Sequence, residues 1–106
     1  VVAGVWLARW HSVMRSKAAR QVLLAAARRD LVEAREAIDK ASLRLWLSDK
    51  DDRLALQLES LSRYLGDDVK TLETEPASYL QQPAKHRERL DQVTQMLLRV
   101  DVLVSA

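Results

Sequence analysis

The sequence predicts an all-α fold, either an antiparallel helical bundle or a stack of helical hairpins, with about four helices. Three observations support this prediction. The chain of 106 residues includes only two glycines and two prolines, so residues that break helices are rare. Apolar residues recur at alternating spacings of about three and four, which is the period of one helix face. No segment alternates apolar and polar residues in the manner of a half-buried strand.

We expect a single helical domain over residues 1–106. At 12.1 kDa, with 48% hydrophobic residues, the chain is long and apolar enough to bury a core. Because the first residue is Val1 rather than Met, we expect a fragment of a longer chain. The apolar run 1–7 is too short to span a bilayer alone, and is either the end of a spanning helix or the buried start of a globular one.

The clearest element is a helix predicted over residues 31–47. Its apolar stripe consists of Leu31, Ala34, Ile38, Ala41 and Leu45. Asp30 is a suitable N-cap, and Glu33 completes a capping box with it. We therefore predict a separate, antiparallel helix over residues 5–28 and a turn at Arg28-Arg29-Asp30. The stripe of that first helix is Leu7, Trp10, Met14, Ala18, Val22 and Ala25, widened by Trp6, Val13 and Leu24. Since neither glycine nor proline marks the turn, the alternative is one rod of roughly forty residues.

Two further long helices are expected in the second half of the chain. One begins after Ser48-Asp49-Lys50-Asp51, where carboxylates favour a helix N-terminus. Its stripe is Leu54, Leu58, Leu61 and Leu65. Gly66 is predicted to end it, and Asp67-Asp68 to start a short further piece. Pro76 then opens a short helical segment, and Pro83 allows the last helix to begin. The stripe of the last helix is Leu90, Val93, Leu97, Val100 and Val104.

The net charge of +2 is unevenly distributed. The first 29 residues contain no acidic residue and six basic ones, namely Arg9, Arg15, Lys17, Arg20, Arg28 and Arg29. This segment either lies against acidic neighbours within the bundle or forms a surface for lipid head groups or nucleic acid. We favour the first interpretation, because a domain that binds phosphates usually carries a larger overall excess of positive charge.

Tryptophans near the N-terminus allow two interpretations. Trp6 and Trp10 share one helix face beside Arg9. They form either an interfacial belt or stacking platform, or a packed edge of the core. We favour the core, because tryptophan in a small bundle is usually buried, and we predict that Trp46 is a core residue as well.

Residue patterns for catalysis or metal binding are missing from the sequence. Cysteine is absent, and neither His11 nor His86 has a second histidine at helical spacing. We expect His86 on a solvated polar face. The pairs Asp51-Asp52 and Asp67-Asp68 are expected to be first-turn acids, since adjacent helical residues diverge by about 100°. With no nucleophile motif and no glycine-rich loop, we predict a non-enzymatic domain without a cofactor or metal.

The sequence resembles the HemX family of Gram-negative bacteria over residues 20–80. The likeness is carried by VLLAAARRDLVEAREAIDKA (22–41), by WLSDKDDRLALQLESL (46–61), and by Val69, Pro76, Ser78 and Leu80, with fainter similarity at Trp6, Trp10 and Arg15. The resemblance implies a membrane-anchored protein with a periplasmic helical region related to tetratricopeptide-like hairpins. Members often carry the name uroporphyrinogen-III C-methyltransferase, but the glycine-bearing S-adenosylmethionine loop of such an enzyme is missing from this sequence.

Taken together, these patterns predict a non-catalytic domain that binds or scaffolds another protein, at the periplasmic face of the inner membrane if the resemblance holds. The predicted partner-binding residues are Trp6, Arg9, Trp10, Met14, Arg15 and Arg20. We expect the contact region in a groove between the first two helices, near Ala37 and Leu45. The alternatives are a basic juxtamembrane module that binds anionic lipid or nucleic acid, and a self-associating coiled-coil bundle.

Overall fold

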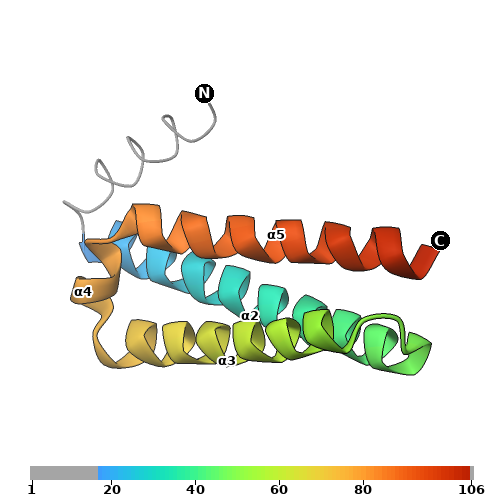
Figure 1. Cartoon of the computed structure of the whole chain (residues 1–106). Coiled ribbons are helices and arrows are strands. Elements are labelled where there is room, and N and C mark those ends of the chain that lie inside the picture. The colour runs from blue at the N-terminus through green and yellow to red at the C-terminus, as the bar shows by residue number, and fades with distance from the viewer. Residues whose placement is uncertain (1–16, 106) are drawn as a thin grey trace.

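The computed structural model describes residues 17–105 and shows an all-α protein (Figure 1). The helices are α2 (Lys17–Ser48), α3 (Asp52–Thr74), α4 (Pro76–Leu80) and α5 (Pro83–Ser105). No strand occurs within these residues. The predicted fold class, an all-α bundle of about four helices, is confirmed.

The other helices assemble on α2. In the view of Figure 1, α5 lies on one side of α2 and α3 lies on the other. α3 runs antiparallel to α2, and α4 turns the chain so that α5 runs in the same direction as α2. Both α3 and α5 pack against α2, but they make few contacts with each other. The space between α3 and α5 is therefore bounded mainly by side chains along their facing edges.

α2 is one continuous helix, and the predicted turn at Arg28-Arg29-Asp30 is wrong. These three residues lie inside α2. The apolar stripe does not stop at this point, because Ala27 is buried one helical turn before Leu31. An aspartate inside a helix costs less than about 1 kcal/mol relative to alanine, which burial of the stripe on both sides readily offsets. The alternative of a single rod is correct for residues 17–48.

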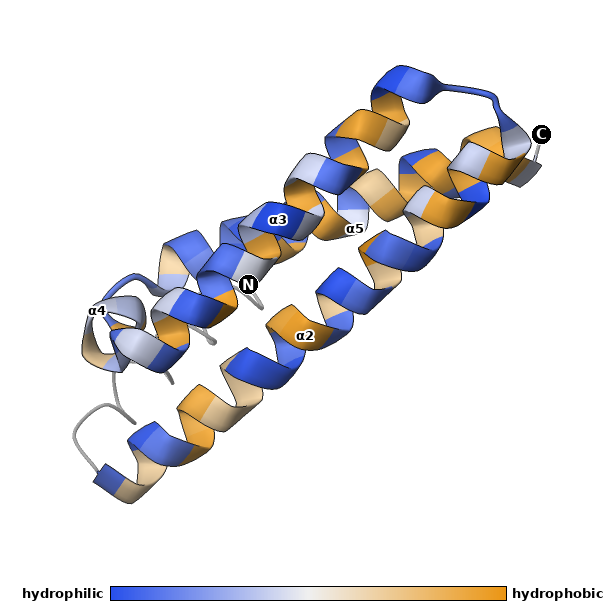
Figure 2. Cartoon of the chain, turned by 90° about the horizontal axis from the view of Figure 1, so that it is seen from below, coloured by the Kyte–Doolittle hydropathy of each residue, from blue (hydrophilic) through white to orange (hydrophobic). Residues whose placement is uncertain are grey.

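The core forms where the stripes of the three long helices meet. α2 contributes Ala27, Leu31, Ala34, Ile38, Ala41 and Leu45. α3 contributes Leu54, Ala55, Leu58, Leu61, Leu65 and Leu72, and α5 contributes Val93 and Val100. Figure 2 shows that hydrophobic and hydrophilic residues alternate in bands along each long helix. The predicted stripes of residues 31–45 and 54–65 are confirmed as buried, whereas Leu90, Leu97 and Val104 of α5 are partly buried against this core.

The N-terminal part of α2 faces the core in a different register from the predicted one. Val22 is 71% exposed and Ala25 is exposed too, although both were expected in the stripe of the first helix. Leu24, predicted to widen that stripe, packs against the core one turn before Ala27. The buried residue Leu31 determines which residues before it face the core, because one helix presents a single stripe to α3 and α5.

α3 begins as predicted but ends later. Asp51 is the N-cap, and its side-chain oxygen accepts a hydrogen bond of 3.0 Å from the backbone N–H of Leu54. Gly66 does not end the helix, which continues to Thr74 because Leu72 is buried as well. A Cβ atom at position 66 would lie 3.0 Å from Nη1 of Arg35. Glycine therefore lets the guanidinium group of Arg35 lie against α3.

The two prolines act as predicted. Pro76 lies in the first turn of α4, and Pro83 begins α5. The pair Asp67-Asp68, expected to start a helix, lies in the interior of α3 instead. Asp68 accepts a 2.8 Å hydrogen bond from Nε of Arg89, so it links α3 to α5. None of the helices α2 to α5 combines the length and apolar character that a membrane span requires.

Trp46 is not a core residue, contrary to the prediction. It lies near the end of α2, is 42% exposed, and donates a 3.0 Å hydrogen bond from its indole N–H to Oε1 of Glu59 on α3. Ala41 and Leu45 occupy the buried stripe at this end of α2, and the indole lies at the edge of the interface with α3. Its polar group is satisfied there without burial.

Candidate functional site

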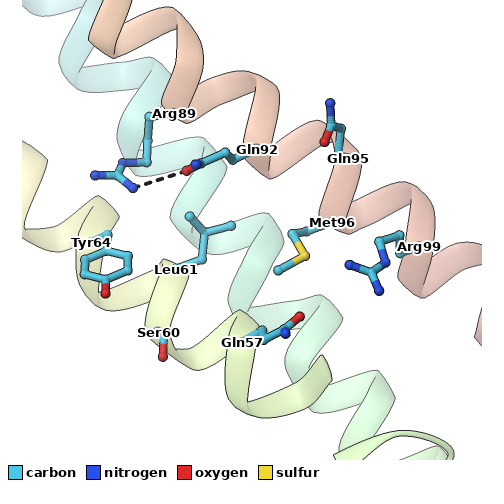
Figure 3. Close-up of a pocket in the computed structure, with 9 residues that line it drawn as sticks. All are labelled: Gln57, Ser60, Leu61, Tyr64, Arg89, Gln92, Gln95, Met96 and Arg99. Atoms are coloured by element: carbon cyan, nitrogen blue, oxygen red, sulfur yellow. Dashed lines mark hydrogen bonds between the residues drawn. The ribbon is translucent and has the colours of Figure 1, made fainter. Parts of the chain in front are cut away.

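A groove of about 430 Å³ lies between α3 and α5 (Figure 3). α3 lines it with Gln57, Ser60, Leu61 and Tyr64, and α5 lines it with Arg89, Gln92, Gln95, Met96 and Arg99. The groove exists because both helices pack on α2 and scarcely contact each other. In Figure 3, α2 passes behind it, and the two lining helices form its walls.

The groove combines an apolar floor with polar rims. Leu61 is buried, and Met96 lies beside it on the facing helix, partly buried against the core. Tyr64 adds an exposed aromatic ring on the α3 wall. The remaining lining residues are glutamines, one serine and two arginines. An apolar floor between polar rims suits one face of an amphipathic helix.

Arg89 stiffens one end of the groove. Its Nε donates to Asp68 on α3 at 2.8 Å, and its Nη1 donates to Gln92 at 3.2 Å. The guanidinium carbon also lies 5.1 Å from the centroid of the Tyr64 ring, a cation–π distance. Arg89 and Asp68 are largely shielded from solvent in this pair. These contacts hold the arginine and the tyrosine in place, so this end of the groove is preformed.

A second hollow of about 380 Å³ continues along α5 toward its C-terminal end. It is lined by Asp51, Leu98, Arg99, Val102 and Leu103. Arg99 borders both hollows, so they adjoin along one helix. Leu98 and Val102 are exposed and one turn apart. From Arg89 to Leu103 the lining residues cover about 21 Å of helix, the length of about four helical turns.

A buried polar cluster at the N-terminal end of α5 joins three helices. His86 is only 2% exposed, contrary to the predicted solvated face. Its Nδ1 shares a hydrogen bond with the hydroxyl of Tyr79 on α4. Its Nε2 lies 3.7 Å from Oδ2 of Asp30 on α2. Asp30, the predicted N-cap, therefore faces His86, which lies far along the chain.

Burial sets the protonation of this cluster. Removal from solvent lowers the pKa of His86, although the charges of Asp30 and Asp68 act in the opposite direction. Burial also raises the pKa of Tyr79, with smaller contributions from the same carboxylates. The phenol therefore stays protonated. The tautomer with its proton on Nε2 points an N–H group toward the Asp30 carboxylate and leaves Nδ1 to accept from the Tyr79 hydroxyl.

The surroundings of His86 leave little room for a ligand. The adjoining cavity has a volume of about 70 Å³ and is lined by Asp68, Thr71, Ser78, Tyr79, Gln82, Lys85 and His86. Within residues 17–105, no three side chains of His, Asp or Glu gather in the way that a metal ion requires. We interpret the cluster as a structural junction between α2, α4 and α5.

Of the predicted partner-binding residues, only Arg20 lies in the part of the chain that the structure describes. Trp6, Arg9, Trp10, Met14 and Arg15 lie outside the described residues. Arg20 is exposed on α2. Of the expected contact region, Leu45 is 1% exposed and is therefore a core residue that no partner can reach. Ala37 is half-buried on α2 and does not line the groove between α3 and α5.

The groove itself was not predicted, although its residues carry a weak signal. Gln57, Ser60 and Tyr64 lie at helical spacing beside the buried stripe of α3. Arg89, Gln92, Met96 and Arg99 lie at the same spacing beside the stripe of α5. Such flanking rows become a groove only if the two helices are held apart, which the sequence of either helix cannot indicate.

Comparisons of the chain with models of protein families, with curated proteins and with solved structures find no match. The likeness to the HemX family therefore stays a prediction.

Proposed function

We propose that this chain is a non-catalytic interaction domain that binds a helix of another protein in the groove between α3 and α5. The observation that carries the proposal is the groove itself, about 430 Å³ in volume, with Leu61, Tyr64 and Met96 between polar rims. A helix laid in a groove anchors itself through apolar side chains spaced about one turn apart. The combined hollows along α5 offer about four such turns.

The packing of the domain supports this role. α3 and α5 are fixed on α2 by a shared apolar core, and Arg89 with Asp68 ties the two walls together at one end. A preformed groove loses little conformational entropy when a partner binds, which favours affinity. By the resemblance to HemX proteins, we place this activity in the extracytoplasmic part of a membrane-anchored bacterial protein, where the domain would act as a scaffold.

Site-specific photo-crosslinking in the source cells tests the proposal. A photoreactive phenylalanine replaces Gln95, which lines the groove, or Glu36, an exposed residue of α2 outside it. We expect Gln95 to crosslink to a discrete second protein through a helical segment of that protein, because its side chain lies at the rim of the site. Mass spectrometry of the crosslinked peptides identifies the segment.

Glu36 provides the matched control. Equal crosslinking from both positions, or none from Gln95, would contradict docking in the groove. Crosslinks from Gln95 only to another copy of this chain would also contradict the proposal and would support the self-associating bundle instead. Separation by size distinguishes the two, since a crosslinked pair of this domain has twice its mass.

A further inference from the structure

The charge pattern of the groove restricts the chemistry of its partner. Among the nine residues that line the larger hollow, two are arginines and none is acidic. Both arginines, Arg89 and Arg99, belong to α5, whereas the α3 wall carries only uncharged polar groups beside its apolar ones. The larger hollow therefore has one cationic rim and one neutral rim, and the acidic residue Asp51 lies beside the second hollow.

The two arginines differ in how much positive charge they offer. Arg89 is paired with Asp68 at 2.8 Å, so its charge is partly neutralised. Arg99 forms no salt bridge with any residue in the range 17–105, and its side chain borders both hollows. Arg99 is thus the main cationic group along the groove, and a partner that places a carboxylate beside it gains a charge-assisted hydrogen bond.

The geometry points to an acidic amphipathic helix as the occupant of the groove, an inference that rests on the proposed function. Its apolar stripe would cover Leu61 and Met96, and its acidic edge would face α5. Arg89 and Arg99 are ten positions apart on one helix, which corresponds to about 15 Å along the axis. A partner helix matches both with acidic residues about eleven positions apart, which lie on one edge because eleven residues make about three full turns.

The chain's own N-terminal segment does not fit this description. Residues 1–16 contain Arg9 and Arg15 and no carboxylate, so their charge has the same sign as the rim. Like charges brought together in a partly desolvated groove oppose binding. The sign of the charge therefore favours a helix from another molecule.

Three synthetic helical peptides of about 18 residues test the inference. All share one leucine stripe, and one edge carries two glutamates about eleven positions apart, two glutamines, or two lysines. Binding is measured by fluorescence anisotropy at low and at high salt. We expect the glutamate peptide to bind about ten-fold more tightly than the glutamine peptide at low salt, the lysine peptide to bind most weakly, and the difference to shrink as salt rises.

A charge-reversal variant locates the effect. Arg99→Glu is expected to weaken binding of the glutamate peptide about ten-fold and to strengthen binding of the lysine peptide. Arg29→Glu makes the same charge change on the exposed side of α2, away from the groove, and should leave the order of the three peptides unchanged. Circular dichroism confirms that both variants remain folded.

The outcomes separate this inference from the proposed function. Equal binding of all three peptides, or no binding of any, overturns the acidic partner, even where Gln95 still crosslinks to a helix of another protein. An effect of Arg29→Glu equal to that of Arg99→Glu also overturns it, because the preference would then arise from overall charge. Loss of the Gln95 crosslinks contradicts the docking proposal itself.

Discussion

Leu58→Ala lowers the free energy of unfolding by about 3 kcal/mol. Leu58 lies midway along α3, is 0% exposed, and belongs to the core that α3 shares with α2. Truncation removes the transfer free energy of the buried methyl groups and leaves a cavity that the rigid neighbouring helices fill only in part. Urea denaturation followed by far-ultraviolet circular dichroism measures the change.

Leu56→Ala provides the matched control. It makes the same chemical change two positions earlier in the same helix, but Leu56 is 56% exposed. We expect the free energy of unfolding to change by less than about 0.5 kcal/mol. Similar losses at both positions would contradict the packing of α3 on α2 and would place a different face of this helix in the core.

His86→Ala lowers the free energy of unfolding by about 2 to 3 kcal/mol at neutral pH, and the loss becomes smaller in mild acid. The substitution removes a buried ring and leaves the half-buried Tyr79 hydroxyl without its acceptor. Because the folded state lowers the pKa of His86, the unfolded chain binds more protons below about pH 6.5. The stability that neutral His86 provides is therefore present above that pH and is lost as the pH falls.

Urea titrations between about pH 5.5 and 7.5 measure both effects, well above the ordinary pKa of carboxylates. Glu88→Ala, an exposed change two positions later on α5, serves as the control and should alter neither the stability nor its pH dependence. A difference between the wild-type protein and His86→Ala that stays constant across this range would show that His86 has the same pKa in the folded and unfolded chain.

Local patterns in the sequence were sufficient to predict α3 to α5 in outline. The leucine stripe of residues 54–65, the start signal in residues 48–51 and the starts at Pro76 and Pro83 depend on neighbouring residues only. The stop at Gly66 was wrong because a distant side chain, Arg35, lies against that position. A glycine that lets a side chain from another helix approach the backbone looks the same in the local sequence as a glycine that ends a helix.

The errors at Asp30 and His86 have one common cause. A capping box is a local signal, but Asp30 lies in a continuous helix and faces His86 on α5. His86 stands in a polar run, which suggested solvent, yet it lies one helical turn before the stripe that contains Leu90 and Val93. The spacing of His86 from Leu90 and Val93 thus indicated that His86 is buried, but its charged neighbours in the sequence indicated a solvated face.

The groove depends on one arrangement, in which α2 is a single helix that carries both α3 and α5. The distance between spin labels at Arg20→Cys and Lys40→Cys tests it most directly. Both positions are exposed, and the chain contains no other cysteine.

A continuous α2 separates the two backbones by about 30 Å, since each residue adds about 1.5 Å along a helix. Double electron–electron resonance should give one distance distribution centred near this value. A hairpin with its turn at Arg28-Arg29-Asp30 would bring the two positions to about 10 Å, the spacing of packed helices. A short distance of that kind would contradict the continuous helix and, with it, the groove between α3 and α5.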